Sequence, residues 1–266
     1  MEIQVLVAAM NQKDYSLLDK MNIKTDVIVG NQCDENAVSD FEYNGHTVKW
    51  LSFCERGVGL NRNNALMRAS SDILLFADED VVYYDDYETI IKEAFEKFPE
   101  ADGFIFNTEM EGERRGRVNS KVKRLRWYNS LNYGMVRLAV KRKSVFRENI
   151  HFSLLFGGGA IYSCGEDTLF IQDCLKKKLK IFTYPKTIAR VNYESSTWFN
   201  GFTDKYFYDK GALMAAVSKK RARALCFLML LKNRKKFGVK FFKAYRLMRK
   251  GIKGYRFLRT YNGELE

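Results

Sequence analysis

The chain has 266 residues, of which 46% are hydrophobic, and it carries 45 Lys/Arg against 32 Asp/Glu for a net charge of +13. This length allows one large domain with its own core, or a domain with an extension. Two prolines exclude a Pro-rich linker, and five scattered cysteines without a C-x-x-C pair argue against a disulfide framework or a zinc site.

The positive charge is concentrated at the C-terminus. Residues 210–266 hold 17 Lys/Arg and two acids, which leaves 28 basic and 30 acidic residues in 1–209. Such a tail favours an anionic partner surface, either membrane lipid or nucleic acid. The N-terminus lacks the basic segment of a signal peptide, and the longest apolar run, residues 224–231, is far below the ~20 residues that span a bilayer. We therefore expect a cytoplasmic protein without a transmembrane anchor.

Short apolar runs alternate with amphipathic segments over the first part of the chain. The apolar runs predict strands buried on both faces, and the amphipathic segments predict helices. This alternation is typical of an α/β fold with a doubly wound, mostly parallel sheet. The expected strands are residues 3–8, 27–30, 48–51, 73–77 and 103–107, and the expected helices are residues 15–21, 60–69 and 87–98.

A basic segment and a glycine-rich segment follow. Residues 111–126 lack apolar periodicity, so we expect an exposed loop, which is either a solvated surface segment or a loop that closes over phosphates. The glycines at 157–159 allow the backbone to approach a ligand closely. Glu166 and Asp167 then open a helix expected over 169–178, where acidic side chains favour the positive helix end. A strand is expected over 180–184, ending at Pro185.

The pattern is helical from residue 197 onward. Apolar residues recur at spacings of three and four between positions 237 and 255, with Lys and Arg on the other faces. A basic amphipathic helix of this kind is typical of an element lying in a membrane interface. The open alternative is that the apolar stripe packs on the body or on a second subunit. We expect a nucleotide-sugar-binding body over residues 1–215 and a basic helical extension over 216–266, with residues 219–259 contacting an anionic membrane.

The strand expected over 73–77 ends in Asp78-Glu79-Asp80. Open α/β sheets bind ligands outside the carboxyl ends of their strands. Two carboxylates at positions i and i+2 repel each other unless a cation joins them, and Mg²⁺ or Mn²⁺ typically takes one or two carboxylates plus phosphate oxygens. The alternative is an ordinary acidic turn. One helix earlier, the guanidinium of Arg62 matches phosphate oxygens.

Four segments, in this order and spacing over residues 1–195, resemble the family 2 glycosyltransferases of the GT-A fold. They are Asn11 after the first strand, Gly59-Leu60-Asn61-Arg62-Asn63, Asp78-Glu79-Asp80 and Gly165-Glu166-Asp167.

The resemblance implies an inverting transfer of a sugar from a nucleotide-diphosphate donor, expected to be a UDP-sugar, to a hydroxyl group. The expected acceptor is a lipid-linked glycan of a bacterial surface polysaccharide, which places the enzyme at the inner face of the cell membrane. Asp80, with Asp78, would hold Mn²⁺ or Mg²⁺, and Asp167 would be the general base with Glu166 as the second choice. The implied donor contacts are Ala9, Asn11, Asn31, Asp34, Arg62, Asn63, Asp78, Glu79, Gly158 and Gly159.

The chain departs from the family pattern at two places. Many relatives carry an Asp-Asp pair after the second strand, where this chain has Gly30-Asn31-Gln32-Cys33-Asp34, so that Asn31 or Asp34 would contact the base. Many also place a His, sometimes a third metal ligand, where this chain has Arg190-Val191-Asn192.

Two other functions account for part of the sequence. A sugar nucleotidyltransferase also binds nucleotide and metal, but it usually has a Gly-rich loop after its first strand, which is missing here. A nucleic-acid-binding protein would use the basic tail, since clustered Lys/Arg with Phe and Tyr suits phosphate contact and base stacking. That function leaves the acidic motifs of the body unexplained, so nucleic acid is not the expected partner.

Overall fold

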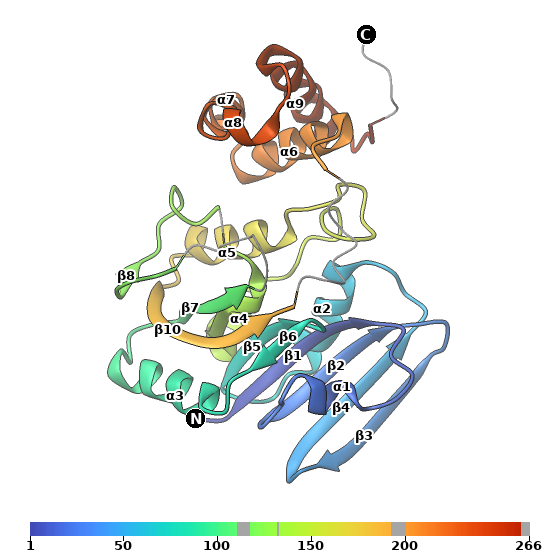
Figure 1. Cartoon of the computed structure of the whole chain (residues 1–266), viewed down its shortest axis with the longest axis vertical. Coiled ribbons are helices and arrows are strands. Elements are labelled where there is room, and N and C mark those ends of the chain that lie inside the picture. The colour runs from blue at the N-terminus through green and yellow to red at the C-terminus, as the bar shows by residue number, and fades with distance from the viewer. Residues whose placement is uncertain (111–117, 132, 193–200, 262–266) are drawn as a thin grey trace.

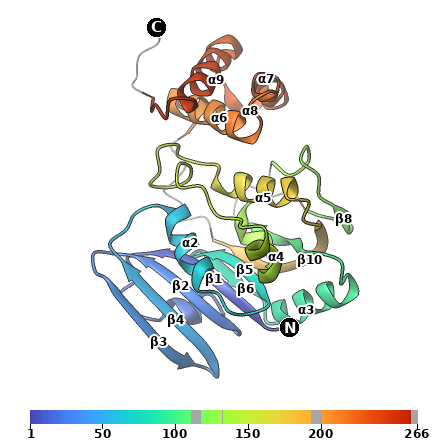
Figure 2. The same ribbon diagram turned by 180° about the vertical axis from the view of Figure 1, so that it is seen from behind.

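The computed structural model describes residues 1–110, 118–131, 133–192 and 201–261. A sheet with its helices forms one end of the molecule and a group of C-terminal helices forms the other, with helix α5 (Glu166–Lys176) between them (Figure 1). The reverse view in Figure 2 shows the same arrangement.

A mostly parallel α/β sheet forms the body, as the sequence predicts. Strands β1 (Ile3–Met10), β2 (Asp26–Gln32), β4 (His46–Phe53) and β5 (Ile73–Asp78) pair in parallel. The other strands are β3 (Ala37–Tyr43), β6 (Val81–Tyr83), β7 (Gly103–Met110), β8 (Lys123–Arg124), β9 (Leu138–Lys141) and β10 (Ile181–Val191). Within the described residues the strand order is β3-β4-β2-β1-β5-β9-β7-β10-β6, with β8 pairing to β10.

Helices cover both faces of the sheet. α1 (Leu17–Lys20) and α3 (Tyr87–Lys97) pack in one core. α2 (Val58–Arg68), α4 (Arg142–Arg147) and α5 pack in a second core on the other face, which also includes Met135 of the short helix η1 (Met135–Arg137). Because both faces are covered, the apolar run of β5 is buried throughout.

The structure differs from two sequence expectations about strands. The prediction that the strand from residue 180 ends at Pro185 is wrong, because β10 continues to Val191. The pairing of β10 with β7 shifts register between Thr183 and Thr187. The exposed Pro185 lies within this shift, where the strand pairing does not need a backbone N–H from residue 185. The edge strand β3, which was not predicted, is mostly exposed and lacks a continuous apolar run. Residues 111–117 of the expected loop lie outside the described residues.

The C-terminal helices are α6 (Asp204–Val217), α7 (Ala222–Lys232), α8 (Arg234–Phe237) and α9 (Phe241–Tyr255). The apolar stripe of α9, including Leu247 and Met248, is buried in a core shared with α6. A Cβ on Gly211 would overlap the Met248 carbonyl oxygen, and one on Gly251 would overlap that of Tyr208, so the two helix backbones approach closely. The stripe thus packs inside the protein, mainly against α6, as in the alternative to a membrane-facing stripe.

The helical unit includes α6. The expected boundary between residues 215 and 216 falls inside this helix, whose buried side chains share one core with α7 and α9. Within the described part of the chain, every helix is too short or too polar to cross a membrane.

Candidate active site

The polar residues singled out in the sequence gather at the carboxyl ends of β1, β2 and β5. The strand register places Ala8 beside Asp78 and Ala9 beside Asn31. The N-terminal half of α2 and the first turn of α5 approach this edge, where the Arg62 side chain of α2 contacts Glu166 and Asp167 of α5. This is the edge of an open α/β sheet at which ligands bind.

The Arg62 guanidinium lies at the centre of the site. Its Nη2 donates to Asp78 Oδ1 at 2.6 Å, and its Nη1 donates to Asp167 Oδ1 at 2.6 Å and to Glu166 Oε1 at 3.3 Å. The Arg62 side chain is only 3% exposed. Burial lowers the pKa of Arg62, but the charges of Asp78, Asp167 and Glu166 outweigh burial and raise that pKa above its ordinary value. Arg62 is therefore a buried counter-ion that joins the two acidic motifs.

Asp167 and Glu166 occupy the first turn of α5. Asp167 Oδ2 accepts a hydrogen bond from the Met135 backbone N–H at 3.0 Å, so both of its oxygens are held. Glu166 is less exposed than Asp167, at 13% against 27% of the side chain. Burial, and then the charge of Asp167, raises the pKa of Glu166 to about 7. Asp167 is thus oriented through both of its oxygens, while Glu166 is poised to hold a proton near neutral pH.

Asp80 has the character of a metal ligand. Its Oδ1 is buried and has no hydrogen-bond partner within the described chain. Burial, and then the charge of Asp78, raises the pKa of Asp80 to about 6. The backbone N–H of Asn192 donates to the Asp80 carbonyl at 3.0 Å, and Asn192 Oδ1 is also buried without a partner among the described residues. The unpaired Asp80 oxygen close to the charge of Asp78, and the unpaired Asn192 oxygen, are hard ligands that suit a divalent cation. No group of three His, Cys, Asp or Glu side chains gathers in the described part of the chain.

Two expected donor residues instead support the loop after β1. Asn31 is buried, its side-chain oxygen accepts from the Gln12 backbone N–H at 2.9 Å, and its Nδ2 donates to the Gln12 carbonyl at 3.0 Å. Glu79 Oε2 accepts from the Met10 N–H at 3.0 Å and from Gln12 Nε2 at 2.7 Å. The Asn31 amide, the alternative base contact, is thus paired with the Gln12 backbone in this structure.

Asn63 has a similar supporting place. Its side chain exchanges hydrogen bonds of 2.8 and 2.9 Å with the backbone of Phe152, and it is buried. Phe152 in turn lies under Arg62, with its ring centroid 5.5 Å from the guanidinium carbon. In this structure Asn63 is thus paired with the backbone of Phe152, and Arg62 is paired with the three carboxylates.

The remaining expected residues surround the site. Ala9 is buried in β1, whereas Asn11 is exposed, has a φ of 53° and donates its N–H to the Gln32 carbonyl. Asp34 is exposed and pairs with Arg56 Nη2 at 2.5 Å. The Gly158 carbonyl accepts from the N–H of Val58 at the start of α2.

Gly159 lies against that same turn. It has a φ of 80°, and an added Cβ would lie 3.1 Å from the backbone of Gly57. The glycines therefore bring the 157–159 loop against the start of α2.

Three contributors were not predicted from the sequence as parts of the site. Gln12 and Met135 act through contacts to Glu79 and Asp167, and Met135 acts through its backbone, so its residue type carries no signal. Asn192 belongs to the segment Arg190-Val191-Asn192, which stands where many members of the resembled family place a His, and that departure was its only signal.

No protein-family model and no curated protein matches the chain. Among solved structures the chain is similar to residues 1–349 of S. aureus TarS, with a TM-score of 0.61 and 16% identity over 100% of this chain and 94% of that one. The TarS complex with UDP-GlcNAc matches with a TM-score of 0.61 and 15% identity over 100% of this chain and 95% of that one.

The mannosyltransferase PcManGT from Pyrobaculum calidifontis, in complex with GDP-Man and Mn²⁺, is also similar. Its TM-score is 0.51 at 11% identity, over 98% of this chain and 76% of that one. At these identities the likeness establishes the fold, and the chain has the GT-A glycosyltransferase fold with a helical C-terminal region.

Proposed function

We propose that the protein is an inverting, metal-dependent glycosyltransferase of the family 2 type, which moves a sugar from a nucleotide-diphosphate donor to a hydroxyl group. One observation carries the proposal: Arg62 joins Asp78, at the end of β5, to Asp167, at the start of α5. The carboxylates suited to the donor diphosphate and the carboxylate suited to the acceptor thus lie on either side of one guanidinium.

The proposed chemistry is a single displacement. Asp167 accepts the proton of the acceptor hydroxyl while that oxygen forms a bond to the anomeric carbon, and the bond from that carbon to the diphosphate oxygen breaks. Attack opposite the leaving group inverts the anomeric configuration. Asp167 suits this task because Arg62 and the Met135 N–H hold its two oxygens in place.

Asp80 and Asp78, with the side-chain oxygen of Asn192, would hold Mn²⁺ or Mg²⁺. When bound, the metal supplies Lewis-acid stabilisation of the charge that develops on the departing diphosphate. The Mn²⁺ in the PcManGT complex supports this assignment. UDP-GlcNAc in the TarS complex supports a UDP-sugar donor.

The location and acceptor are also proposals. The exposed faces of α7 and α9 carry Phe227, Leu228, Leu231 and Phe242, with exposures of 45 to 84%. Phe227 contacts Phe241, so the two helices form one apolar patch. Between α7 and α9 the chain carries further exposed cations, namely Lys232, Arg234, Lys235, Lys236 and Lys240. This combination fits the anionic inner face of a cell membrane and therefore a lipid-linked glycan acceptor.

The experiment for the reaction is a thermal-shift screen of nucleotide sugars with Mn²⁺, followed by detection of the nucleoside diphosphate released. A donor that binds raises the melting temperature. Release of pyrophosphate would instead indicate a nucleotidyltransferase, and no shift with any nucleotide sugar would contradict the proposal.

The experiment for the surface is vesicle flotation of the wild type and of Leu228→Ser/Phe242→Ser. We expect the wild type to float with vesicles that contain phosphatidylglycerol but not with vesicles of phosphatidylcholine alone. The double variant should remain in the bottom fraction with both kinds of vesicle. Val38→Ser, at an exposed position on β3, is the control. Binding of nucleic acid in place of vesicles would favour the alternative partner.

A further inference from the structure

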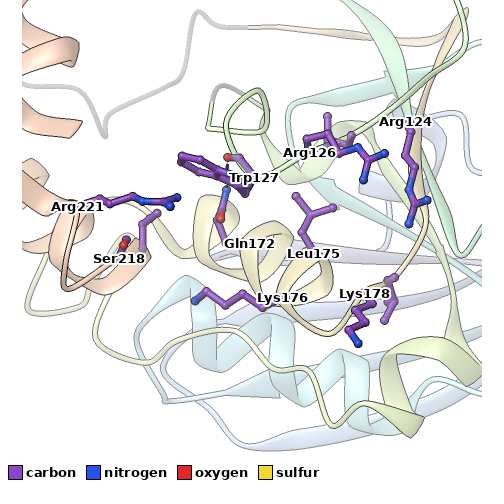
Figure 3. A pocket seen from close by; sticks show the side chains of 12 residues that line it. Arg124, Arg126, Trp127, Gln172, Leu175, Lys176, Lys178, Ser218 and Arg221 are labelled. Atoms are coloured by element: carbon purple, nitrogen blue, oxygen red, sulfur yellow. Dashed lines mark hydrogen bonds between the residues drawn. The ribbon is translucent and has the colours of Figure 1, made fainter. Parts of the chain in front are cut away.

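A pocket of about 390 Å³ lies between the second half of α5, the segment around β8 and the turn from α6 to α7 (Figure 3). Its lining does not include Asp78, Glu166 or Asp167 of the candidate active site. Trp127 and Arg126 reach it from the β8 side, and Arg221 reaches it from the start of α7. Buried or half-buried apolar side chains complete its wall, namely Leu125, Leu175, Leu179 and Val217.

The pocket is cationic. Its lining has five basic residues, Arg124, Arg126, Lys176, Lys178 and Arg221, and no acidic residue.

Two of these cations have partners. Lys176 pairs with Asp173 at 2.9 Å, and the Arg221 guanidinium lies 4.7 Å from the centre of the Trp127 ring. Arg124, Arg126 and Lys178 form no ion pair within the described chain. Unpaired cations around a concave, partly apolar wall provide a site for an anionic group attached to an uncharged body.

The pocket is connected to the candidate base. Gln172 lines it five residues after Asp167 on the same helix, which corresponds to roughly 7.5 Å along the helix axis. Gln172 Nε2 donates to the Trp127 carbonyl at 2.9 Å and to Ser130 Oγ at 2.5 Å. The same stretch of chain leads to Met135, whose N–H holds Asp167. The pocket and Asp167 therefore share helix α5.

We propose that this pocket binds a phosphate group of the acceptor, with the Trp127 ring and the leucines contacting the uncharged part next to that phosphate. The inference rests on the proposed glycosyl transfer for the identity of the ligand as acceptor. The phosphate belongs either to a lipid carrier or to a repeating phosphodiester, and both present the same anion to the pocket.

Trp127 provides the readout, because its ring lines the pocket and is 42% exposed. The wild type is titrated with decyl phosphate, with sn-glycerol 3-phosphate and with uncharged decyl maltoside, each below micelle-forming concentration. We expect a saturable change in tryptophan fluorescence with a phosphate ligand and none with decyl maltoside. Trp127→Phe should remove the change, which assigns it to this residue.

Arg126→Gln/Lys178→Gln should weaken phosphate binding by about tenfold or more. Arg147→Gln/Lys143→Gln removes one Arg and one Lys from exposed positions on α4 and should bind as the wild type does. Tighter binding of decyl phosphate identifies a lipid phosphate, and equal or tighter binding of glycerol phosphate identifies a phosphodiester repeat. Equal binding of decyl maltoside, equal weakening by both double variants, or no phosphate binding overturns the proposal.

A UDP-GlcNAc thermal shift on the same proteins separates the two proposals. If the wild type changes its Trp127 fluorescence with phosphate but binds no nucleotide sugar, the pocket proposal stands and the proposed function is contradicted. If the wild type and Arg126→Gln/Lys178→Gln show the same thermal shift with UDP-GlcNAc, but the wild type binds neither decyl phosphate nor glycerol phosphate, the proposed function stands and the pocket proposal is contradicted.

Discussion

Arg62 Nη1 and Asp167 Oδ1 lie 2.6 Å apart although the two residues are separated by 105 positions in the chain. The same guanidinium reaches Asp78 through its other terminal nitrogen. Three carboxylates at the edge of the sheet therefore share one buried cation. The positions of these carboxylates depend on that cation, and the first prediction concerns its removal.

Replacing Arg62 by Lys should damage both stability and activity. An ammonium cannot bridge Asp78 and Asp167 with two separate nitrogens, so at least one carboxylate loses its partner. We expect the free energy of unfolding to fall by about 2–4 kcal/mol and glycosyl transfer to fall by at least about 100-fold. Urea denaturation and product release measure the two effects. Arg68→Lys, on an exposed part of the same helix, is the control, and equal behaviour of the two variants would contradict the prediction.

Asp167→Asn should separate binding from chemistry. The amide retains the size of the side chain but cannot take a proton, so kcat should fall by about 10³-fold while the donor-induced thermal shift persists. Glu166→Gln should lower kcat less, because its carboxyl is more buried than that of Asp167. Steady-state rates at saturating donor distinguish the two. The larger loss in Glu166→Gln would instead assign the base to Glu166.

Glu166 should make stability depend on pH. Its pKa is raised to about 7 in the folded protein from 4.5, mainly by burial. Between these values the folded state keeps a proton that the unfolded state has released, so the contribution of this group to stability is largest below pH 4.5 and is lost as pH rises toward 7. The loss is on the order of 1–3 kcal/mol. The difference in unfolding free energy between wild type and Glu166→Gln should therefore shrink or reverse over this range, and a constant difference would refute the assignment.

Asp80 should control metal binding and its pH dependence. Its pKa is raised to about 6, mainly by burial, so protons compete with the metal below that pH. The affinity for Mn²⁺ should fall by about tenfold per pH unit below pH 6. Asp80→Asn should abolish binding in isothermal titration of the metal, whereas Asp85→Asn, which alters an exposed carboxylate paired with Lys24, should not.

Gly251→Ala should destabilise the helical unit. In an exposed helix this change stabilises by up to about 1 kcal/mol, but here the added Cβ would overlap the Tyr208 carbonyl oxygen. We therefore expect a loss of about 1–3 kcal/mol, measured by thermal unfolding. Lys253→Ala, at an exposed position of the same helix, should be neutral. A stabilising Gly251→Ala would mean that α6 and α9 do not pack as described.

Local sequence was sufficient for the α/β class and the central strands, and it also singled out the residues of the candidate site. Those features follow from properties of neighbouring residues, because a strand such as β5 must be apolar throughout when helices cover both faces. The acidic pairs were found for the same reason, since each directly follows or opens an element.

Only the tertiary structure decided how these residues are used. The apolar stripe of α9 has the same sequence whether it faces lipid or α6. The two helix backbones approach closely at Gly211 and Gly251, which shows that the stripe faces α6. In the same way, a guanidinium suited to phosphate in sequence is occupied by Asp78 and Asp167 in the fold. Periodicity and composition describe one segment at a time, whereas burial and charge pairing depend on which distant segments the fold brings into contact.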